Sequence, residues 1–150
     1  AILWLSQQGM STKDIETMLY QESGLKGLSG ISSDMRALLD SDTPRARLAI
    51  DFYAYRAAQE IGKLATTLGG LDALVFTAGI GANSPPVREK ICARLADLFG
   101  IGLDAGANGE NRQRISRDNS RVPVLVLPTD EEGMIALNTA RIMKEQGAGT

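Results

Sequence analysis

The fold of this chain is decided by one stretch, Leu74-Val75-Phe76-Thr77-Ala78-Gly79-Ile80-Gly81-Ala82-Asn83-Ser84, an apolar run that stops at two glycines spaced one residue apart. A short apolar run bounded by glycine is typical of a buried strand. Two prolines come next, Pro85 and Pro86, and proline is favoured in the first turn of a helix. The stretch therefore predicts a strand at about 72–77, a tight turn, and a helix from Pro85 to about Phe99.

The turn itself suits a ligand. Because glycine has no Cβ, Gly79 and Gly81 can take positive φ values and let a base or ribose lie against the main chain, with Ile80 as an apolar contact for a flat ring. Pro85 and Pro86 lack the amides that a helix N-terminus would offer to phosphate. We expect the turn to hold the adenosine end of a nucleotide, or at most its first phosphate. The alternative is a tight turn with a purely structural role.

A second strand-to-helix junction carries carboxylates. The β-branched run 122–127 predicts a fully buried strand, and Pro128-Thr129-Asp130-Glu131-Glu132 follows it. Thr129 and Glu132 have the spacing of a capping box, which would occupy Glu132 on its own helix. Glu131, and the aspartate before it, would then be available to a hard cation such as Mg²⁺, directly or through water. The alternative is that these acids only complement the helix dipole.

A third cluster, Ser32-Ser33-Asp34-Met35-Arg36, lies in a predicted loop. Asp34 could accept hydrogen bonds from ribose hydroxyls, and Arg36 could stack its planar guanidinium on an adenine ring. An aspartate and an arginine this close are also a common local feature of protein surfaces.

The remaining pattern predicts helices at 1–9, 11–21, 44–68 and about 130–144, a loop at 23–33, and short possible strands at 101–103 and 114–116. The longest helix opens at Thr43-Pro44 and has apolar residues at helical spacing: Leu48, Phe52, Tyr55, Ile61, Leu64, Ala65 and Leu68. The order strand–helix–strand–helix predicts an α/β fold with a parallel sheet flanked by helices. Two strands are too few to bury these helices, so we expect an incomplete sheet.

Bulk properties narrow the classes of function. A net charge of −2 over 150 residues gives no reason to expect nucleic acid, and no apolar stretch reaches the roughly 18 residues of a membrane span. The single cysteine, Cys92, fits a reducing compartment such as the cytoplasm, and we interpret it as a buried structural thiol. The chain has no histidine and starts, at Ala1-Ile2-Leu3, as if inside a helix. We therefore expect a piece of a longer protein.

The combination of motifs is similar to a known family. Four motifs occur in order: Glu22-Ser23-Gly24-Leu25-Lys26-Gly27-Leu28-Ser29, Ser33-Asp34-Met35-Arg36, Phe76 to Arg88, and Pro128-Thr129-Asp130-Glu131-Glu132. Together they resemble the C-terminal part of the acetate kinase family, over essentially the whole chain. The resemblance implies part of a ribonuclease-H-like domain of the actin and Hsp70 superfamily. It also implies transfer of phosphate from ATP to acetate with Mg²⁺, in a homodimer that dimerises through this part.

The resemblance also implies roles for individual residues. The implied nucleotide contacts are Asp34, Met35 and Arg36 from one segment, and Gly79, Ile80, Gly81, Ala82 and Asn83 from the glycine turn. Glu131 matches the metal-linked glutamate of the family. Two positions depart from the family pattern, because Ala82 replaces a glutamate and Ala78 replaces a glycine. The family's catalytic residues lie in a part that precedes this chain, so we assign none here and expect the chain alone to be inactive.

Three alternatives stay open. A propionate or butyrate kinase differs only in the acid pocket, which we expect to lie outside this chain. A nucleotide sensor of the same fold would use ATP to drive domain motion without catalysis. A folding or dimerisation module would use the apolar surface of the 44–68 helix, without a nucleotide.

Overall fold

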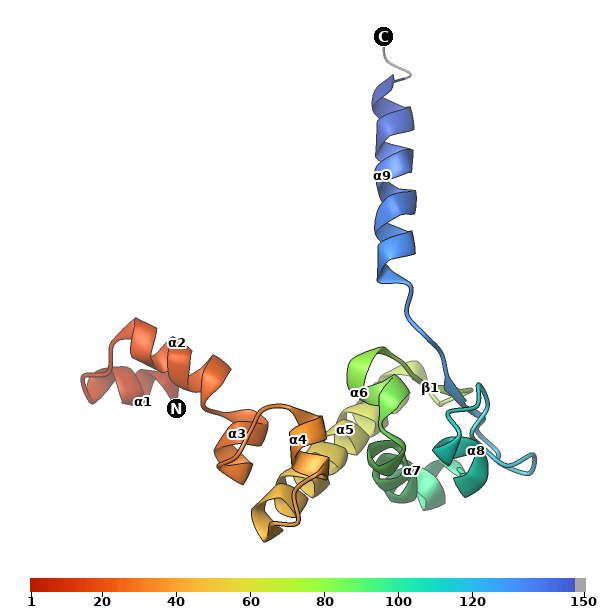
Figure 1. Cartoon of the computed structure of the whole chain (residues 1–150), viewed down its shortest axis with the longest axis horizontal. Coiled ribbons are helices and arrows are strands. Elements are labelled where there is room, and N and C mark those ends of the chain that lie inside the picture. The colour runs from red at the N-terminus through yellow and green to blue at the C-terminus, as the bar shows by residue number, and fades with distance from the viewer. Residues whose placement is uncertain (148–150) are drawn as a thin grey trace.

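The structure is a computed structural model that describes residues 1–147 and, within them, the side chains of all but Glu131 and residues 145–147. The elements follow one another in the order α1 (Ile2–Gln7), α2 (Thr12–Gln21), α3 (Gly24–Ser29), α4 (Met35–Leu39), α5 (Pro44–Leu68), β1 (Leu74–Phe76), α6 (Ala78–Asn83), α7 (Pro85–Phe99), α8 (Ala105–Gly109), β2 (Val124–Val126) and α9 (Glu131–Gly147). A central body holds α3 to α8 and the strands, while α1 and α2 form an arm at one end and α9 projects away (Figure 1).

The two strands form a parallel sheet. Leu74 pairs with Val124 and Phe76 with Val126, which confirms both predicted strands and their relative direction. The core lies between this sheet, α5 and α7, with Ile91, Cys92 and Leu95 of α7 buried in it. Antiparallel bridges join Leu103 to Ser116 and Arg114 to Leu125, so the two short strands predicted between the helices exist as single bridges. Within the described residues the sheet has no further strand, as expected for an incomplete sheet.

The segment predicted as a loop at 23–33 is the main error at this level. It contains the six-residue helix α3, which ends at Gly30 with a left-handed φ of 68°. Glycine and serine disfavour helix on their own, but Leu25 and Leu28 pack against the core and α3 lies against α5. Burial of these two leucines stabilises the helix despite the low helix propensity of its glycines and serines. The segment is too short for the spacing of its apolar residues to predict a helix.

Helix α5 has the predicted ends. Thr43 caps it by accepting a hydrogen bond from the amide of Ala46, and Gly69 ends it in the left-handed conformation. The buried face of α5, however, is not the one marked by the large apolar residues at helical spacing. The buried side chains are mostly alanines, which let α5 lie close to α7 and α3, and they are Ala46, Ala49, Ile50, Ala54, Ala58 and Ala65. Large apolar residues at that spacing are exposed instead, and these are Leu48, Phe52, Tyr55, Leu64 and Leu68.

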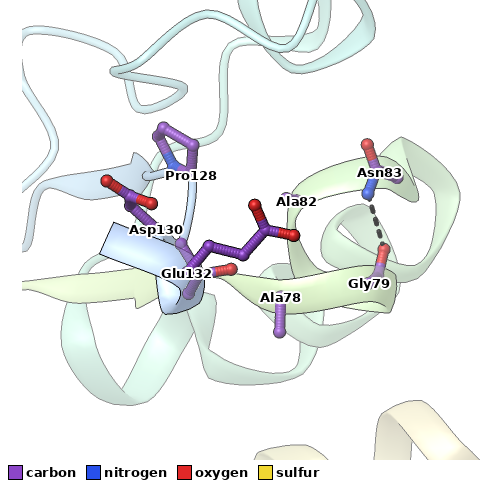
Figure 2. Close-up of a pocket in the computed structure, with 8 residues that line it drawn as sticks. Ala78, Gly79, Ala82, Asn83, Pro128, Asp130 and Glu132 are labelled. Carbon is purple, nitrogen blue, oxygen red and sulfur yellow. Dashed lines mark hydrogen bonds between the residues drawn. The ribbon is translucent and has the colours of Figure 1, made fainter. Parts of the chain in front are cut away.

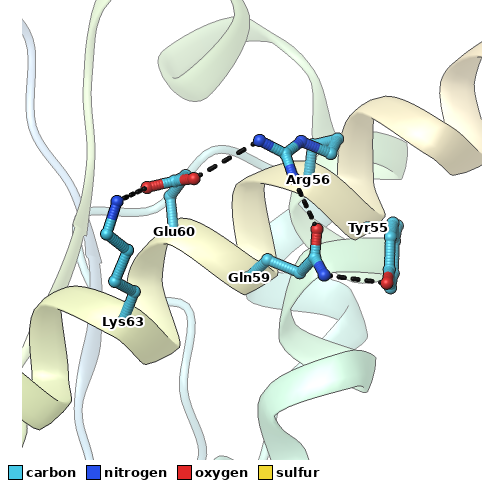
Figure 3. A network of polar contacts seen from close by, with 5 residues as sticks. All are labelled: Tyr55, Arg56, Gln59, Glu60 and Lys63. Carbon is cyan, nitrogen blue, oxygen red and sulfur yellow. Dashed lines mark hydrogen bonds and ion pairs between the residues drawn. The ribbon is translucent and has the colours of Figure 1, made fainter.

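The outer side of α5 also carries a polar network (Figure 3). Gln59 donates to the Tyr55 hydroxyl at 2.8 Å and accepts from Arg56 at 2.9 Å. Glu60 pairs with both Arg56 and Lys63, in each case at 3.4 Å. These i, i+3 and i, i+4 contacts identify a helix face that is open to solvent in this structure.

Helix α2 begins as predicted, because Ser11 accepts a hydrogen bond from the amide of Asp14 at 3.1 Å. None of the helices in the described residues is long and apolar enough to cross a membrane.

Candidate functional site

The predicted glycine turn is a short helix, α6, that follows β1 directly. Its positive φ lies at Ala78, with a value of 58°, and neither Gly79 nor Gly81 has one. The prediction that the two glycines take positive φ is therefore wrong. After β1, Thr77 is extended, Ala78 is left-handed and the chain then continues as a helix, so only one left-handed residue occurs at this junction.

The two glycines serve another purpose. A Cβ on Gly81 would lie 3.5 Å from the main chain of Phe76, so this residue packs closely against the end of the strand. A Cβ on Gly79 would meet nothing within 4 Å, so its backbone faces open space. A Cβ on Gly81 would thus make only an ordinary contact with the strand, whereas Gly79 leaves the outer surface of α6 bare, which suits an approaching ligand.

One cavity, of about 320 Å³, joins α6 to the start of α4. Its lining includes the predicted nucleotide segment and the glycine helix, which are more than 40 residues apart in sequence: Ser33, Asp34, Met35, Arg36, Leu39, Gly79, Ile80, Asn83 and Ser84. The sequence alone gave no reason for these two segments to share a cavity, apart from the family resemblance. We call this cavity the α4–α6 cavity.

The polar groups of the α4–α6 cavity are accessible. Asp34 caps α4 by accepting a hydrogen bond from the amide of Arg36 at 2.9 Å, yet 56% of its side chain stays exposed. The Arg36 side chain is 89% exposed and lies 3.9 Å from the Asp34 carboxylate. Met35 is buried beneath them. Asp34 therefore has a capping role that the sequence analysis missed, and both charged groups can still meet a ligand.

A second cavity, of about 600 Å³, lies along a neighbouring face of α6, and we call it the α6–α9 cavity. It is lined by Ala78, Gly79, Ala82, Asn83, Pro128, Thr129, Asp130 and Glu132 (Figure 2). Because β1 and β2 are parallel and Phe76 pairs with Val126, the segments that follow both strands meet at one edge of the sheet. Gly79 and Asn83 line both cavities, and the Asn83 amide donates to the Gly79 carbonyl at 3.0 Å.

The carboxylates of the α6–α9 cavity differ from the prediction. Asp130, rather than Thr129, accepts a hydrogen bond from the amide of Gly133, at 2.9 Å, so the expected capping box is wrong. Glu132 is not held on its own helix and points its carboxylate toward α6 (Figure 2). The Glu131 side chain lies outside the described residues, so the prediction for it stays untested.

The donor set of this cavity fits one kind of metal site. Among the described residues, no group of three or more histidine, cysteine or acidic side chains lies together. A cage made entirely of protein ligands is therefore not formed by that part of the chain. One or two carboxylates beside an open cavity suit Mg²⁺, which usually keeps several waters and binds through substrate phosphates.

The sequence analysis included Arg88 in the motif that runs from Phe76 but assigned it no role. It lies on α7 and is completely buried, and burial lowers the pKa of its guanidinium while the nearby Cys92 opposes this shift. Its guanidinium donates hydrogen bonds to the carbonyls of Gly81 and Ala82 at the end of α6. Arg88 shares the helical spacing of the buried residues Ile91, Cys92 and Leu95, and an arginine within an apolar stripe is the feature that could have revealed it.

Ser84 joins α6 to α7 and lines the α4–α6 cavity. It is 5% exposed, and its hydroxyl has no hydrogen-bond partner among the described residues. A buried polar atom without a partner is uncommon in proteins and costs stability.

Comparison with known proteins gives a consistent result. The model of the Acetokinase family matches residues 1–137. An acetate kinase from Nitrobacter hamburgensis is 47% identical over 150 residues, which are 99% of this chain and 37% of that relative. The crystal structure of an acetate kinase from Porphyromonas gingivalis superposes with a TM-score of 0.84 and 38% identity, covering 95% of this chain and 37% of that one.

A propionate kinase from Francisella tularensis also superposes, with a TM-score of 0.81 and 34% identity over 90% of this chain and 35% of that one. This chain thus spans a little over a third of the length of the proteins it matches. These likenesses identify the fold as the α/β fold shared by acetate and sugar kinases, Hsp70 and actin. The match of the family model and the identity to curated acetate kinases show that this chain belongs to the acetokinase family.

Proposed function

We propose that this chain is the C-terminal, nucleotide-side portion of an acetate kinase. A carboxylate oxygen of acetate would attack the γ-phosphorus of ATP, and the bond from that phosphorus to the β-phosphate oxygen would break, leaving acetyl phosphate and ADP. The observation that carries the proposal is the position of α6 between two cavities. One is lined by Asp34 and Arg36, and the other by the carboxylate of Glu132.

The nucleotide would extend along α6. On the α4–α6 side, Ile80 and the Arg36 guanidinium would contact the adenine faces, and Asp34 would accept from the ribose hydroxyls. Met35 would support this wall from beneath. The bare backbone of Gly79 would let the nucleotide lie close to the helix.

The remaining predicted contacts lie on the same helix. Gly81 would lie where α6 contacts the end of β1, and Asn83 would present its amide to both cavities. Ala82 lines the α6–α9 cavity where the family carries a glutamate, so a polar contact is absent at that point.

The phosphates would extend toward the α6–α9 cavity, and Mg²⁺ would be held there by Glu131, with Glu132 beside it. The metal, when bound, supplies positive charge that neutralises phosphate oxygens. The part of this chain is to position the nucleotide and its metal. The residues that stabilise the transferring phosphoryl group would come from elsewhere in the intact protein, and the chain alone would not catalyse the reaction.

The test is an acid-dependent assay of the intact protein. It is given MgATP with acetate, and acetyl phosphate is trapped by hydroxylamine while ADP is measured. The proposal predicts one ADP for each acyl phosphate and no ADP formation above background without the acid. ADP formation that is independent of any carboxylic acid would contradict the proposal and favour a nucleotide sensor.

The same assay decides between acids. A propionate kinase is the second candidate, because a solved propionate kinase matches this chain nearly as well as an acetate kinase does. A higher kcat/KM with propionate than with acetate would select it, and a higher value with butyrate would select a butyrate kinase. Arg36→Ala should raise the KM for ATP, whereas Arg56→Ala, in the polar network of α5, should leave it unchanged.

We further propose a homodimer and a cytoplasmic location. The exposed side chains of Leu48, Phe52 and Tyr55 on α5 support the first, because they offer apolar surface that a partner would cover. The single buried cysteine supports the second. Sedimentation equilibrium of the intact protein tests the dimer, and a monomer across micromolar concentrations would contradict it.

A further inference from the structure

Arg88 holds the C-terminal end of the glycine helix in place. One terminal guanidinium nitrogen donates to the carbonyl oxygens of Gly81 and Ala82, both at 2.9 Å. These are among the last carbonyls of α6, and carbonyls at a helix end have no partner within their own helix. The Arg88 side chain thus supplies hydrogen bonds to two carbonyl oxygens at the end of α6 and so ties this end of the helix to α7.

The other side of the guanidinium is fixed by α8 and the residues after it. Nε donates to the side-chain oxygen of Asn108 at 2.8 Å, and the second terminal nitrogen donates to the Asn108 carbonyl at 2.8 Å and to the side chain of Asn111 at 2.6 Å. Asn108 in turn donates to the carbonyl of Pro85 at 3.0 Å. Together these contacts link α6, α7 and α8 through one planar group, and we call them the Arg88 network.

The chemistry of the Arg88 network is unusual for a buried charge. None of the five oxygens that accept hydrogen bonds from Arg88 belongs to a carboxylate, so neutral oxygens alone compensate the charge. Burial of a charge is costly unless its hydrogen bonds are all made. A leucine or methionine at this position would fill the same core volume without the free-energy cost of removing a charge from water. What arginine adds is a rigid fork of donors that fixes the positions of several acceptors at once.

We infer that Arg88 is a positioning residue for the nucleotide site, acting through the carbonyls of Gly81 and Ala82. This inference rests on the proposed function. With the end of α6 held, Gly79, Ile80 and Asn83 keep a fixed relation to the α4–α6 cavity, and the nucleotide need not order the helix when it binds. Because less order has to be created on binding, preorganisation of this kind raises the affinity for the nucleotide. Loss of the network should therefore weaken nucleotide binding without altering the acid site.

The first test uses Arg88→Lys in the intact protein. The ammonium keeps the charge but cannot span acceptors on both sides, so we expect the Kd for MgADP and the KM for ATP to rise by about tenfold, the lower end of the range for supporting residues. The KM for acetate should stay within about twofold. Arg94→Lys is the matched control, because Arg94 lies on the same helix, is exposed and stacks on Tyr55 away from α6. It should change neither constant.

A second pair of variants, at Asn111, tests the inference even if the Arg88→Lys variant does not fold. Asn111 is exposed and has a φ of 52°, which glycine adopts without strain, so Asn111→Gly removes one acceptor and leaves the core intact. It should raise the KM for ATP by about threefold, whereas Asn111→Asp keeps an acceptor oxygen and should restore the wild-type value. All constants are measured at a temperature where circular dichroism shows each variant folded.

The outcomes separate the two proposals. If the unmodified protein shows no acid-dependent ADP formation, the proposed function fails and the inference fails with it. If the unmodified protein is active, but folded Arg88→Lys and Asn111→Gly keep the wild-type KM for ATP and Kd for MgADP, the proposed function survives. Arg88 is then a structural residue only, and the inference is wrong.

Discussion

At the scale of single residues, Ala78 carries backbone strain at the entrance to the glycine helix. Its φ of 58° is left-handed, which costs a non-glycine residue about 1 kcal/mol or more. Ala78→Gly should therefore stabilise the protein by about 0.5–1 kcal/mol, after allowance for the greater freedom of glycine in the unfolded chain. Urea unfolding measures this free energy.

The matched control for Ala78 is Ala93, on the exposed face inside α7. Ala93→Gly should destabilise by about 1 kcal/mol, because glycine is a poor helix residue. If both substitutions lower stability equally, Ala78 is not strained and this description of the turn is wrong.

Cys92 provides a prediction for pH. Burial raises the pKa of its thiol from 9.0 to about 12, and the charge of Arg88 opposes part of that shift. The unfolded chain loses this proton near pH 9.0, whereas the folded chain keeps it until about pH 12. The stabilisation from the neutral thiol is therefore complete below pH 9.0 and declines above it, by at most about 1.4 kcal/mol per pH unit.

Cys92→Ala isolates this contribution. The variant should be less stable than wild type at neutral pH because of the cavity that it leaves, and the gap should narrow between about pH 9 and about pH 11. Chemical unfolding across that range measures both proteins. A gap that stays constant would show that the thiol titrates alike in both states.

Ser84 allows one more test at this scale. Since its buried hydroxyl has no partner among the described residues, Ser84→Ala should leave stability unchanged or raise it by up to about 1 kcal/mol. A loss of more than that amount in thermal unfolding would mean that the hydroxyl makes a hydrogen bond that this structure does not contain.

The role of a residue could be predicted from the sequence where that role depends on its near neighbours in the chain, and not where it depends on distant residues. Glycines after a strand and acids after a second strand were identifiable, because each depends on a few neighbours. The cap at Asp130 was placed one residue too early, since several polar residues in a row compete for the same amides. Arg88 could not be assigned a partner, because its acceptors lie up to 23 residues away and include main-chain carbonyls, which any sequence supplies.

At the scale of elements, the two ends of α5 were predictable and its buried face was not. Thr43 and Gly69 delimit α5 by local chemistry, and both predictions are confirmed. The buried face of α5 depends on its neighbours, and here the close approach of α7 selects alanines over the larger residues that a hydrophobic pattern favours. Most of the large apolar residues that recur at helical spacing lie on the exposed side of the helix, and these are Leu48, Phe52, Tyr55, Leu64 and Leu68.

This reversal predicts the effects of substitutions on α5. Ala54 is fully buried, so Ala54→Leu should overpack the core and destabilise by about 1–3 kcal/mol. Leu64 is 59% exposed, and Leu64→Ala should change stability by less than about 0.5 kcal/mol. The midpoints of urea unfolding compare the two directly. A larger loss from Leu64→Ala than from Ala54→Leu would mean that the faces are assigned the wrong way round.

At the scale of the whole molecule, the topology explains why the site exists. Two parallel strands end at the same edge of the sheet, and each is followed by a helix. The parallel topology is therefore enough to place α6 beside the acidic segment Asp130–Glu132. This arrangement follows from the prediction of an α/β fold with a parallel sheet. The approach of α4 to α6, which completes the α4–α6 cavity, does not, because α4 was not predicted as a helix.

The same scale shows where apolar surface is left uncovered. Helix α9 exposes Met134, Ile135, Leu137 and Met143, and α1 exposes Ile2, Leu3 and Trp4. Both helices lie away from the central body in Figure 1. The site, in contrast, is built from α4, α6 and the two strand ends within that body, together with the first turn of α9.

The central claim is that a nucleotide binds along α6, between the two cavities. The most direct measurement is a titration of the isotope-labelled chain with MgADP, followed by the amide resonances in two-dimensional NMR. We predict saturable shifts at Asp34–Arg36, Gly79–Asn83 and Asp130–Glu132, with the resonances of α1 and α2 unchanged. Saturable shifts confined to other elements, or a spectrum that millimolar MgADP leaves unchanged, would contradict the claim.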